Sequence, residues 1–192
     1  VLRSNHVNYL FGSIGKEFEK KFSAFSNTHH ALALANGTLA LDACLRSLRL
    51  SHEDEVLVTS RSFIASASSI ALLGATPIWC DVDLNSQNIL LDEIIKRCTK
   101  RTKGIICVHF AGFPCEMDSI MEFAKAKNLF VVEDCAQAHG AKINGISVGS
   151  FGHMSAWSFC NDKIMTLGGE GGMITTNDVD LYDKAASFNN HG

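Results

Sequence analysis

Three groups of residues along the chain are of types that could act together in one reaction. Lys163 stands just before a glycine-rich run at 168–172, Asp134 ends an apolar run, and Asn36-Gly37-Thr38 precede a helical pattern of leucines. A lysine amine can attack a carbonyl carbon, and a carboxylate can hold a ring nitrogen in its protonated form. The free N–H groups at the start of a helix favour a phosphate. Together these groups indicate a site for pyridoxal phosphate (PLP).

Each group also has a simpler explanation. Asn36 or Thr38 could be an ordinary helix cap, and Asp134 could cap the segment that follows its strand. Most lysines are solvated, but Lys163 is flanked by Cys160, Ile164 and Met165 rather than by a run of like charges. An apolar setting of this kind suits a nucleophilic amine.

Composition excludes several other classes of protein. The chain has 192 residues, of which 46% are hydrophobic and 19% charged, and its net charge is −3. This predicts one globular domain and gives no support to a nucleic-acid partner or an anionic membrane surface. No apolar stretch is long enough to span a membrane, and residues 1–8 contain no apolar core of a secretory signal. We therefore expect a cytoplasmic protein.

Cysteines and histidines give no sign of a metal site or a disulfide framework. Seven cysteines are present, an odd number, and no two of them form a C-x-x-C pair. This favours buried thiols in a reducing compartment. The eight histidines form no H-x-x-x-H or H-E-x-x-H pair, so we expect no metal site. Cys135 and His139 do not suggest a nucleophilic pair, because no third group is evident to orient them.

The hydrophobic pattern alternates between helical and strand-like segments. Helices are expected at 14–25, 37–48, 63–73, 91–98, 117–127 and 179–187, and strands at 55–59, 76–82, 104–109, 129–133, 155–159 and 172–176. Apolar strands that alternate with helices predict a three-layer α/β/α fold around a mostly parallel, mixed sheet. The glycine-rich run at 168–172 does not have the G-x-G-x-x-G spacing of a dinucleotide loop. We expect a turn there that lets the backbone pass close to a bound group.

Several motifs, in this order along the chain, carry a resemblance to a known family. The blocks are Ala35–Leu41, Gly74–Pro77, Glu133–Gly140, Ser158-Phe159 with Lys163, and Gly169–Gly172. They closely resemble the large domain of sugar aminotransferases of the DegT/DnrJ/EryC1/StrS family. That resemblance implies a fold-type I PLP enzyme with the aspartate aminotransferase fold, and it runs from about Phe18 to Gly192.

The resemblance also implies a role for individual residues. Lys163 matches the lysine that forms the Schiff base with the cofactor, and Asp134 matches the partner of its pyridinium nitrogen. Gln137 matches a residue near the phenolic oxygen of the cofactor. The remaining cofactor-binding positions are three that match phosphate binders and one that matches the aromatic residue on the ring: Gly37, Thr38, Ser158 and Phe63.

Members of this family usually transfer an amino group from glutamate to a keto group of a nucleotide-linked sugar, for polysaccharide, lipopolysaccharide or antibiotic synthesis. A sister group replaces the lysine by histidine and dehydrates instead, so Lys163 favours transamination. Family members commonly have Asn after the lysine, where this chain has Ile164. They also act as homodimers.

Family members are about twice as long as this chain and carry a C-terminal small domain. We therefore expect residues 1–192 to form the PLP-binding large domain of a truncated protein without the small domain. Two alternatives remain open: a non-catalytic PLP-binding or interaction domain, and a PLP-dependent sugar dehydratase.

Overall fold

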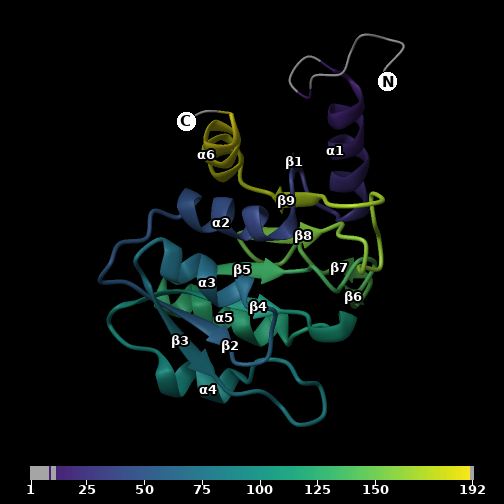
Figure 1. Ribbon diagram of the computed structural model, residues 1–192. Coiled ribbons are helices and arrows are strands. Elements are labelled where there is room, and N and C mark those ends of the chain that lie inside the picture. The colour runs from purple at the N-terminus through teal and green to yellow at the C-terminus, as the bar shows by residue number, and fades with distance from the viewer. Residues whose placement is uncertain (1–8, 10–11, 191–192) are drawn as a thin grey trace.

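The computed structural model describes Tyr9 and residues 12–190, which form a mixed sheet of seven strands with helices on both faces (Figure 1). Residues 1–8, where we expected no secretory signal, lie outside this part of the chain. The order across the sheet is β1-β9-β8-β5-β4-β2-β3. Its strands are β1 (His30–Leu34), β2 (Glu55–Thr59), β3 (Thr76–Cys80), β4 (Thr102–Val108), β5 (Phe130–Asp134), β8 (Met154–Ser158) and β9 (Gly172–Thr176).

The sheet is mostly parallel, as the sequence predicts. β2 pairs in parallel with β3 and β4, β4 pairs with β5, and β5 pairs with β8. Among the described strands of this sheet, β9 alone runs against the others, because it pairs antiparallel with both β8 and β1. Every residue of β2, β8 and β9 is buried, which is typical of central strands covered on both faces.

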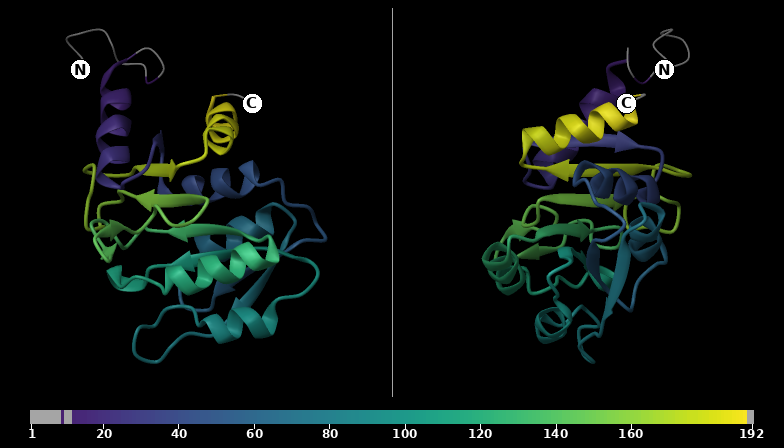
Figure 2. Two further views of the ribbon diagram at one scale, coloured as in Figure 1. Left: turned by 180° about the vertical axis from the view of Figure 1, so that it is seen from behind. Right: turned by 90° about the vertical axis from the view of Figure 1, so that its left-hand side faces the viewer.

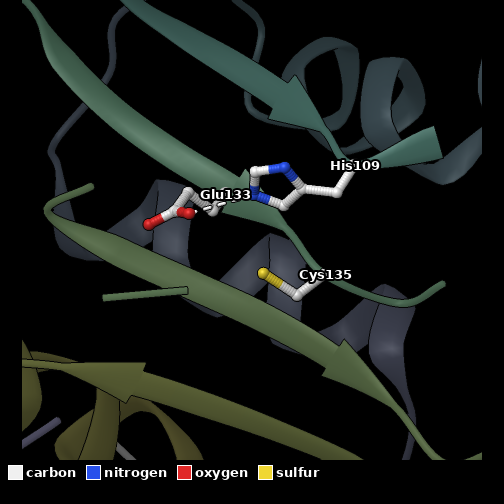
Figure 3. A group of neighbouring side chains, drawn as sticks. All are labelled: His109, Glu133 and Cys135. Carbon is white, nitrogen blue, oxygen red and sulfur yellow. Dashed lines mark hydrogen bonds and ion pairs between the residues drawn. The ribbon is translucent and has the colours of Figure 1, made fainter. Parts of the chain in front are cut away.

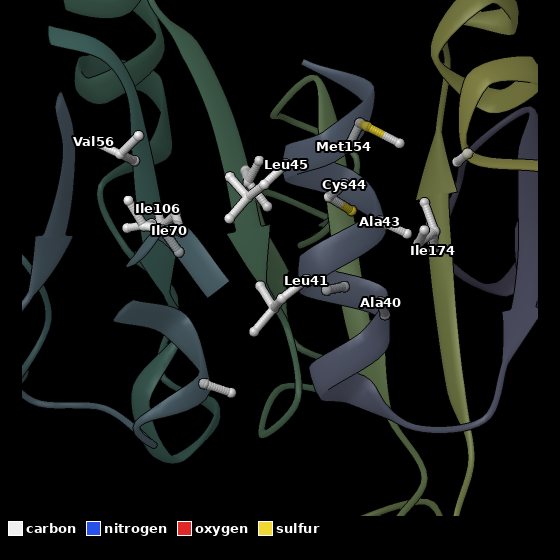
Figure 4. Packing of buried hydrophobic residues seen from close by; sticks show 14 of the residues in the cluster. Ala40, Leu41, Ala43, Cys44, Leu45, Val56, Ile70, Ile106, Met154 and Ile174 are labelled. Atoms are coloured by element: carbon white, nitrogen blue, oxygen red, sulfur yellow. The ribbon is translucent and has the colours of Figure 1, made fainter. Parts of the chain in front are cut away.

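Six α-helices within the described residues cover the two faces (Figure 2). They are α1 (Ile14–Phe25), α2 (Gly37–Ser47), α3 (Ala65–Leu72), α4 (Leu91–Arg97), α5 (Met117–Lys127) and α6 (Val179–Asn189). One face packs against α2, α3 and α6, and Figure 4 shows this core around Leu41 and Leu45. The other face packs against α4 and α5, and further along against α1. Side chains alternate along β2, so Val56 and Val58 point into the first core and Leu57 points into the second.

The three-layer α/β/α prediction is confirmed, with shifts of one to two residues at most element ends. Two features differ from the expectation. β1 was not predicted at all, and neither was the small hairpin of β6 (Lys142–Ile143) and β7 (Ile146–Ser147). None of the described helices has the length and apolar character needed to cross a membrane.

The carboxyl ends of β4, β5 and β8 meet at one edge of the sheet, and α2 begins beside them. Asp134 is the last residue of β5, Ser158 is the last of β8, and Gly37 is the first of α2. In open α/β sheets, ligands bind at this edge. The topology therefore brings together residues from distant parts of the chain at the place where a site is expected.

Candidate active site

A pocket of about 370 Å³ lies at this edge of the sheet. Its volume is in the range of small-molecule sites. All seven residues singled out from the sequence line it: Gly37, Thr38, Phe63, Asp134, Gln137, Ser158 and Lys163. The structure therefore brings every predicted site residue into one cavity.

The start of α2 forms one end of the pocket. Asn36 is the N-cap of this helix, and its side-chain oxygen accepts a hydrogen bond from the Leu39 amide at 2.9 Å. The Ala40 amide bonds to the Asn36 carbonyl at 3.1 Å. The amides of Gly37 and Thr38 stand in the first turn, where no preceding turn supplies an acceptor. These two N–H groups are therefore suited to bind an anion. Asn36 can cap the helix at the same time, because it engages the Leu39 amide instead.

Glycine at position 37 is required by the close approach of β8. A Cβ built on Gly37 would lie 2.7 Å from the Ser158 Cβ, much closer than such atoms normally come. Gly172 has a similar constraint, because a Cβ there would collide with the Asn36 carbonyl. The glycine run was expected to let the backbone pass close to a bound group, and at Gly172 the structure shows a close approach to the protein's own backbone. Its close neighbour is the backbone that enters α2.

Asp134 forms the floor of the pocket and is only 5% exposed. Its Oδ2 accepts a hydrogen bond from the Ser66 hydroxyl at 2.7 Å, and its Oδ1 accepts one from the Ala136 amide at 3.1 Å. Burial raises the pKa of Asp134 above its usual range, although these hydrogen bonds and the charge of Lys163 act in the opposite direction. A buried carboxylate of this kind is stabilised by a cationic group placed beside it.

Lys163 enters the pocket from the loop between β8 and β9, with its side chain 22% exposed. Its Nζ lies 3.3 Å from the Asp162 carboxylate, and this contact holds the pKa of Asp162 below its usual value. Two hydrogen bonds hold this loop in place. The Lys163 amide bonds to the Cys160 carbonyl at 3.0 Å, and the Cys160 thiol donates to Glu170 at 3.1 Å.

Gln137 and Phe63 form the sides of the pocket. The Gln137 Oε1 accepts a hydrogen bond from the Ala111 amide at 2.8 Å. Phe63 is 66% exposed, and it lines the pocket just before α3. Its ring is therefore accessible to a planar ligand.

Two serines outside the predicted site residues contact Asp134 directly or through each other. Ser66 bonds to Asp134, and its hydroxyl also shares a hydrogen bond of 2.6 Å with Ser62. Ser62 lies just before α3 and Ser66 lies in its first turn, so their contact depends on how the chain enters the helix, which the sequence pattern does not report.

A buried group of three potential metal ligands lies behind the pocket (Figure 3). The ligand atoms of His109, Glu133 and Cys135 lie within 4.8 Å of one another. No sequence motif reports this group, because His109 follows β4, whereas Glu133 lies in β5 and Cys135 follows that strand.

Hydrogen bonds within the protein already engage the polar atoms of this group. The His109 Nε2 lies 2.9 Å from the Glu133 Oε2, and the His109 Nδ1 accepts from the Cys115 amide at 3.0 Å. Glu133 also accepts three backbone amides, those of Gly149, Phe151 and Gly152. We therefore interpret the group as a structural anchor for residues 149–152.

Cys135 and His139 do not form a nucleophilic pair, and none was expected from the sequence. Cys135 is fully buried, and burial raises its pKa to about 12. His139 is 8% exposed, and burial, followed by the charge of Lys163, lowers its pKa to about 4. A thiol with such a pKa remains protonated and is a poor nucleophile at neutral pH.

Comparison with known proteins gives the family. The model of the DegT/DnrJ/EryC1/StrS aminotransferase family matches residues 1–192. The chain belongs to this family. It is 44% identical over 189 residues to GDP-perosamine synthase of Escherichia coli O157:H7, covering 98% of the chain and 50% of that protein.

Two further relatives show the same relationship. A UDP-N-acetyl-3-dehydro-alpha-D-glucosamine 3-aminotransferase of Acidithiobacillus ferrooxidans is 40% identical over 186 residues, which are 97% of the chain and 50% of the relative. The crystal structure of the aminotransferase from Psychrobacter cryohalolentis superposes with a TM-score of 0.98 at 54% identity, and it covers all of this chain and 49% of the other. The DegT/DnrJ/EryC1/StrS chain described here therefore spans about half the length of these relatives.

Proposed function

We propose that this chain is the cofactor-binding part of a PLP-dependent aminotransferase that acts on a nucleotide-linked sugar. One observation carries the proposal. A single pocket holds a lysine amine, a buried carboxylate and the start of a helix with two free amides, and these come from Lys163, Asp134 and Gly37-Thr38. Membership of an aminotransferase family supports the same conclusion.

The residues of the pocket fit PLP group by group. The first amides of α2 with the hydroxyls of Thr38 and Ser158 suit a phosphate, and the narrow gap between Gly37 and Ser158 keeps these donors together. The buried Asp134 carboxylate suits a protonated pyridine nitrogen, which would offset its burial. Phe63 offers a flat apolar surface for the ring.

Bound in this pocket, PLP would supply an electron sink for carbanion chemistry. Lys163 would hold the cofactor through its carbonyl carbon, and its Nζ is placed to hold and move a proton at the substrate carbon. Asp134 would hold the ring nitrogen in its protonated form. The Asp162 carboxylate lies 3.3 Å from the Lys163 Nζ.

The names of relatives support the substrate class. Proteins named GDP-perosamine synthase, UDP-sugar 3-aminotransferase and dTDP-sugar transaminase are all 40–44% identical to this chain. We propose a keto group of a nucleotide-linked sugar as acceptor, glutamate as amino donor, and a role in polysaccharide or lipopolysaccharide synthesis. A homodimer in the cytoplasm, completed by a small C-terminal domain, is part of the same proposal.

Absorption spectroscopy of the 192-residue protein with added PLP tests the cofactor assignment. We expect a visible absorption band at a wavelength close to that of the cofactor itself. After borohydride reduction the cofactor should remain attached to the protein as a label, and mass spectrometry should locate this label on Lys163. Lys163→Ala should lose the label, whereas Lys142→Ala, at an exposed lysine of the β6–β7 hairpin, should keep it. A label that persists in Lys163→Ala contradicts the assignment.

The reaction itself is tested by incubating the same protein with glutamate and a keto derivative of GDP-, UDP- or dTDP-linked sugar. Formation of the amino sugar with release of 2-oxoglutarate supports transamination. Loss of water from the sugar without consumption of glutamate would instead indicate the dehydratase alternative. A protein that binds PLP but turns over no sugar supports the non-catalytic alternative for this chain.

A further inference from the structure

Asn88 is a buried polar residue outside the pocket, 4% exposed, in the segment between β3 and α4. Both ends of its carboxamide are engaged by one short loop. Its Oδ1 accepts a hydrogen bond from the Phe110 amide at 3.0 Å, and its Nδ2 donates to the Phe113 carbonyl at 2.9 Å. A single side chain thus joins the two ends of residues 110–113.

The loop that Asn88 holds has an unfavourable backbone conformation. Ala111 has φ of 50° and Gly112 has φ of 81°, so two successive residues are left-handed. This region is accessible to glycine but costs free energy for alanine, and Ala111 is exposed and has no core packing to impose it. The two hydrogen bonds from Asn88 support this conformation from outside the loop. Gln137, which accepts from the Ala111 amide, and Arg61, whose guanidinium lies 4.7 Å from the Phe110 ring centroid, contact the loop as well.

The left-handed conformation aims the Ala111 amide at the active site. That amide donates to the Gln137 Oε1 at 2.8 Å. A glutamine amide can present either its oxygen or its NH₂ group to a ligand, and a donor on the oxygen decides between them. With Oε1 occupied, Gln137 retains its Nε2 hydrogens as donors for the pocket that it lines with Asp134 and Lys163.

We propose that Asn88 is a positioning residue for the cofactor site. It locks the 110–113 loop so that the Ala111 amide orients Gln137 as a hydrogen-bond donor toward an anionic oxygen of the bound cofactor. The identity of that ligand rests on the proposed function, whereas the contacts from Asn88 to Gln137 do not. Asn88 acts through the loop and does not itself line the pocket.

Amide hydrogen exchange of the protein without cofactor tests the mechanical part. In Asn88→Ala, exchange of the Ala111 amide should accelerate about tenfold or more, because its hydrogen bond loses its support. Asn88→Asp keeps the acceptor for Phe110 and loses the donor, so it should show a smaller acceleration. Asn85→Ala, at an exposed residue of the same segment, should leave the exchange unchanged. Equal protection of Ala111 in folded Asn88→Ala and wild type overturns the proposal.

The pH titration of the visible band of PLP bound to the protein tests the functional part. An anionic oxygen that loses a hydrogen-bond donor is less stabilised and binds a proton more readily. Asn88→Ala should therefore raise the midpoint of the titration by about 0.5 to 1 pH unit. Gln137→Ala should raise it similarly, and the double variant should add little further. Additive shifts, or an unchanged midpoint in Asn88→Ala, contradict the role of Asn88. Wild-type protein that binds no PLP overturns the proposed function, and the Ala111 exchange then still decides the mechanical part.

Discussion

At the scale of single residues, Asp134 combines two opposing requirements. Its burial disfavours the charged form, yet its proposed partner is a cation. We predict that Asp134→Asn leaves the free energy of unfolding of the cofactor-free protein unchanged or higher, because this position then buries no charged group. The affinity for PLP should fall about 10- to 100-fold with the loss of a charged hydrogen bond.

Thermal unfolding and fluorescence titration with PLP measure these two effects separately. Asp162→Asn is a matched control, because Asp162 lines the same pocket but its side chain is 68% exposed. This control should change the affinity far less than Asp134→Asn. A marked loss of stability in cofactor-free Asp134→Asn would contradict the explanation.

Gly37 is a second residue whose type follows from a single contact. In Gly37→Ala, the new Cβ would meet the Ser158 Cβ at 2.7 Å, so the start of α2 must move away from β8. We predict a loss of about 1–3 kcal/mol in the free energy of unfolding, as for other overpacked sites, together with weaker PLP binding. Urea denaturation and PLP titration measure both.

Two variants distinguish this clash from a general intolerance of alanine. Gly169→Ala, where an added Cβ meets nothing within 4 Å, should behave as wild type. Removal of the opposing Cβ in the double variant Gly37→Ala/Ser158→Gly should restore much of the stability. Failure of the second substitution to restore any stability would show that the clash is not the cause.

At the scale of elements, Glu133 links β5 to β4 and to residues 149–152 through one buried carboxylate. It accepts hydrogen bonds from three backbone amides and lies 2.9 Å from His109. We predict that Glu133→Ala costs about 3–5 kcal/mol in the free energy of unfolding, because it leaves several buried donors without a partner. Urea denaturation measures this cost.

Glu93 provides the matched control for this prediction. It forms ion pairs with Lys96 and Arg97 on the surface of α4. Pairs of this kind contribute little, so Glu93→Ala should cost at most about 1 kcal/mol. Similar losses in the free energy of unfolding of the two variants would mean that the buried hydrogen bonds of Glu133 stabilise the fold no more than surface ion pairs do.

The helices and most strands could be predicted because their patterns are local. β1 could not, because His30–Leu34 becomes a strand only through pairing with β9, which lies far along the chain. The β6–β7 hairpin turns at Asn144-Gly145, both with positive φ, and that dipeptide is a recognised hairpin signal that the hydrophobic pattern does not contain.

The site shows the same division between local and distant information. Asp134, Ser158 and Gly37 stand at the ends of predicted elements, so topology alone brings them together. The hydrogen bonds between Asn88 and Phe110 and between Ala111 and Gln137 join three loops, and no periodicity in the sequence reports such contacts. The residues proposed to bind the cofactor could thus be selected from the sequence, whereas the contacts that orient them required the structure.

At the scale of the whole molecule, a cluster of aromatic rings joins α1 to the end of the sheet beside the active site. The Phe22 ring centroid lies 5.2 Å from both Trp157 and Phe159, and His139 lies 5.4 Å from the same two rings. Both ring nitrogens of His139 lack a hydrogen-bond partner among the described residues. This histidine is therefore held in its neutral form.

The neutral His139 makes the stability of the fold dependent on pH. Burial lowers its pKa in the folded protein from the usual 6.5 to about 4, so between these values the unfolded chain binds a proton that the folded chain does not. Stability from this group is complete above pH 6.5 and falls as the pH is lowered toward 4, by at most about 1.4 kcal/mol per pH unit. Burial lowers the pKa of His153 as well, and it acts in the same direction.

The contribution of His139 can be isolated by a difference between two proteins. We predict that His139→Phe, which fills the aromatic cluster without a titrating group, loses less stability than wild type as the pH is lowered from 6.5 to 4. Urea denaturation at several pH values measures both curves, and carboxylates and His153 contribute equally to each. Parallel curves would contradict the prediction, because the proton uptake on unfolding would then come from other groups. A smaller loss in His139→Phe than in wild type would mean that the packing of α1 onto the sheet itself disfavours the protonated imidazole.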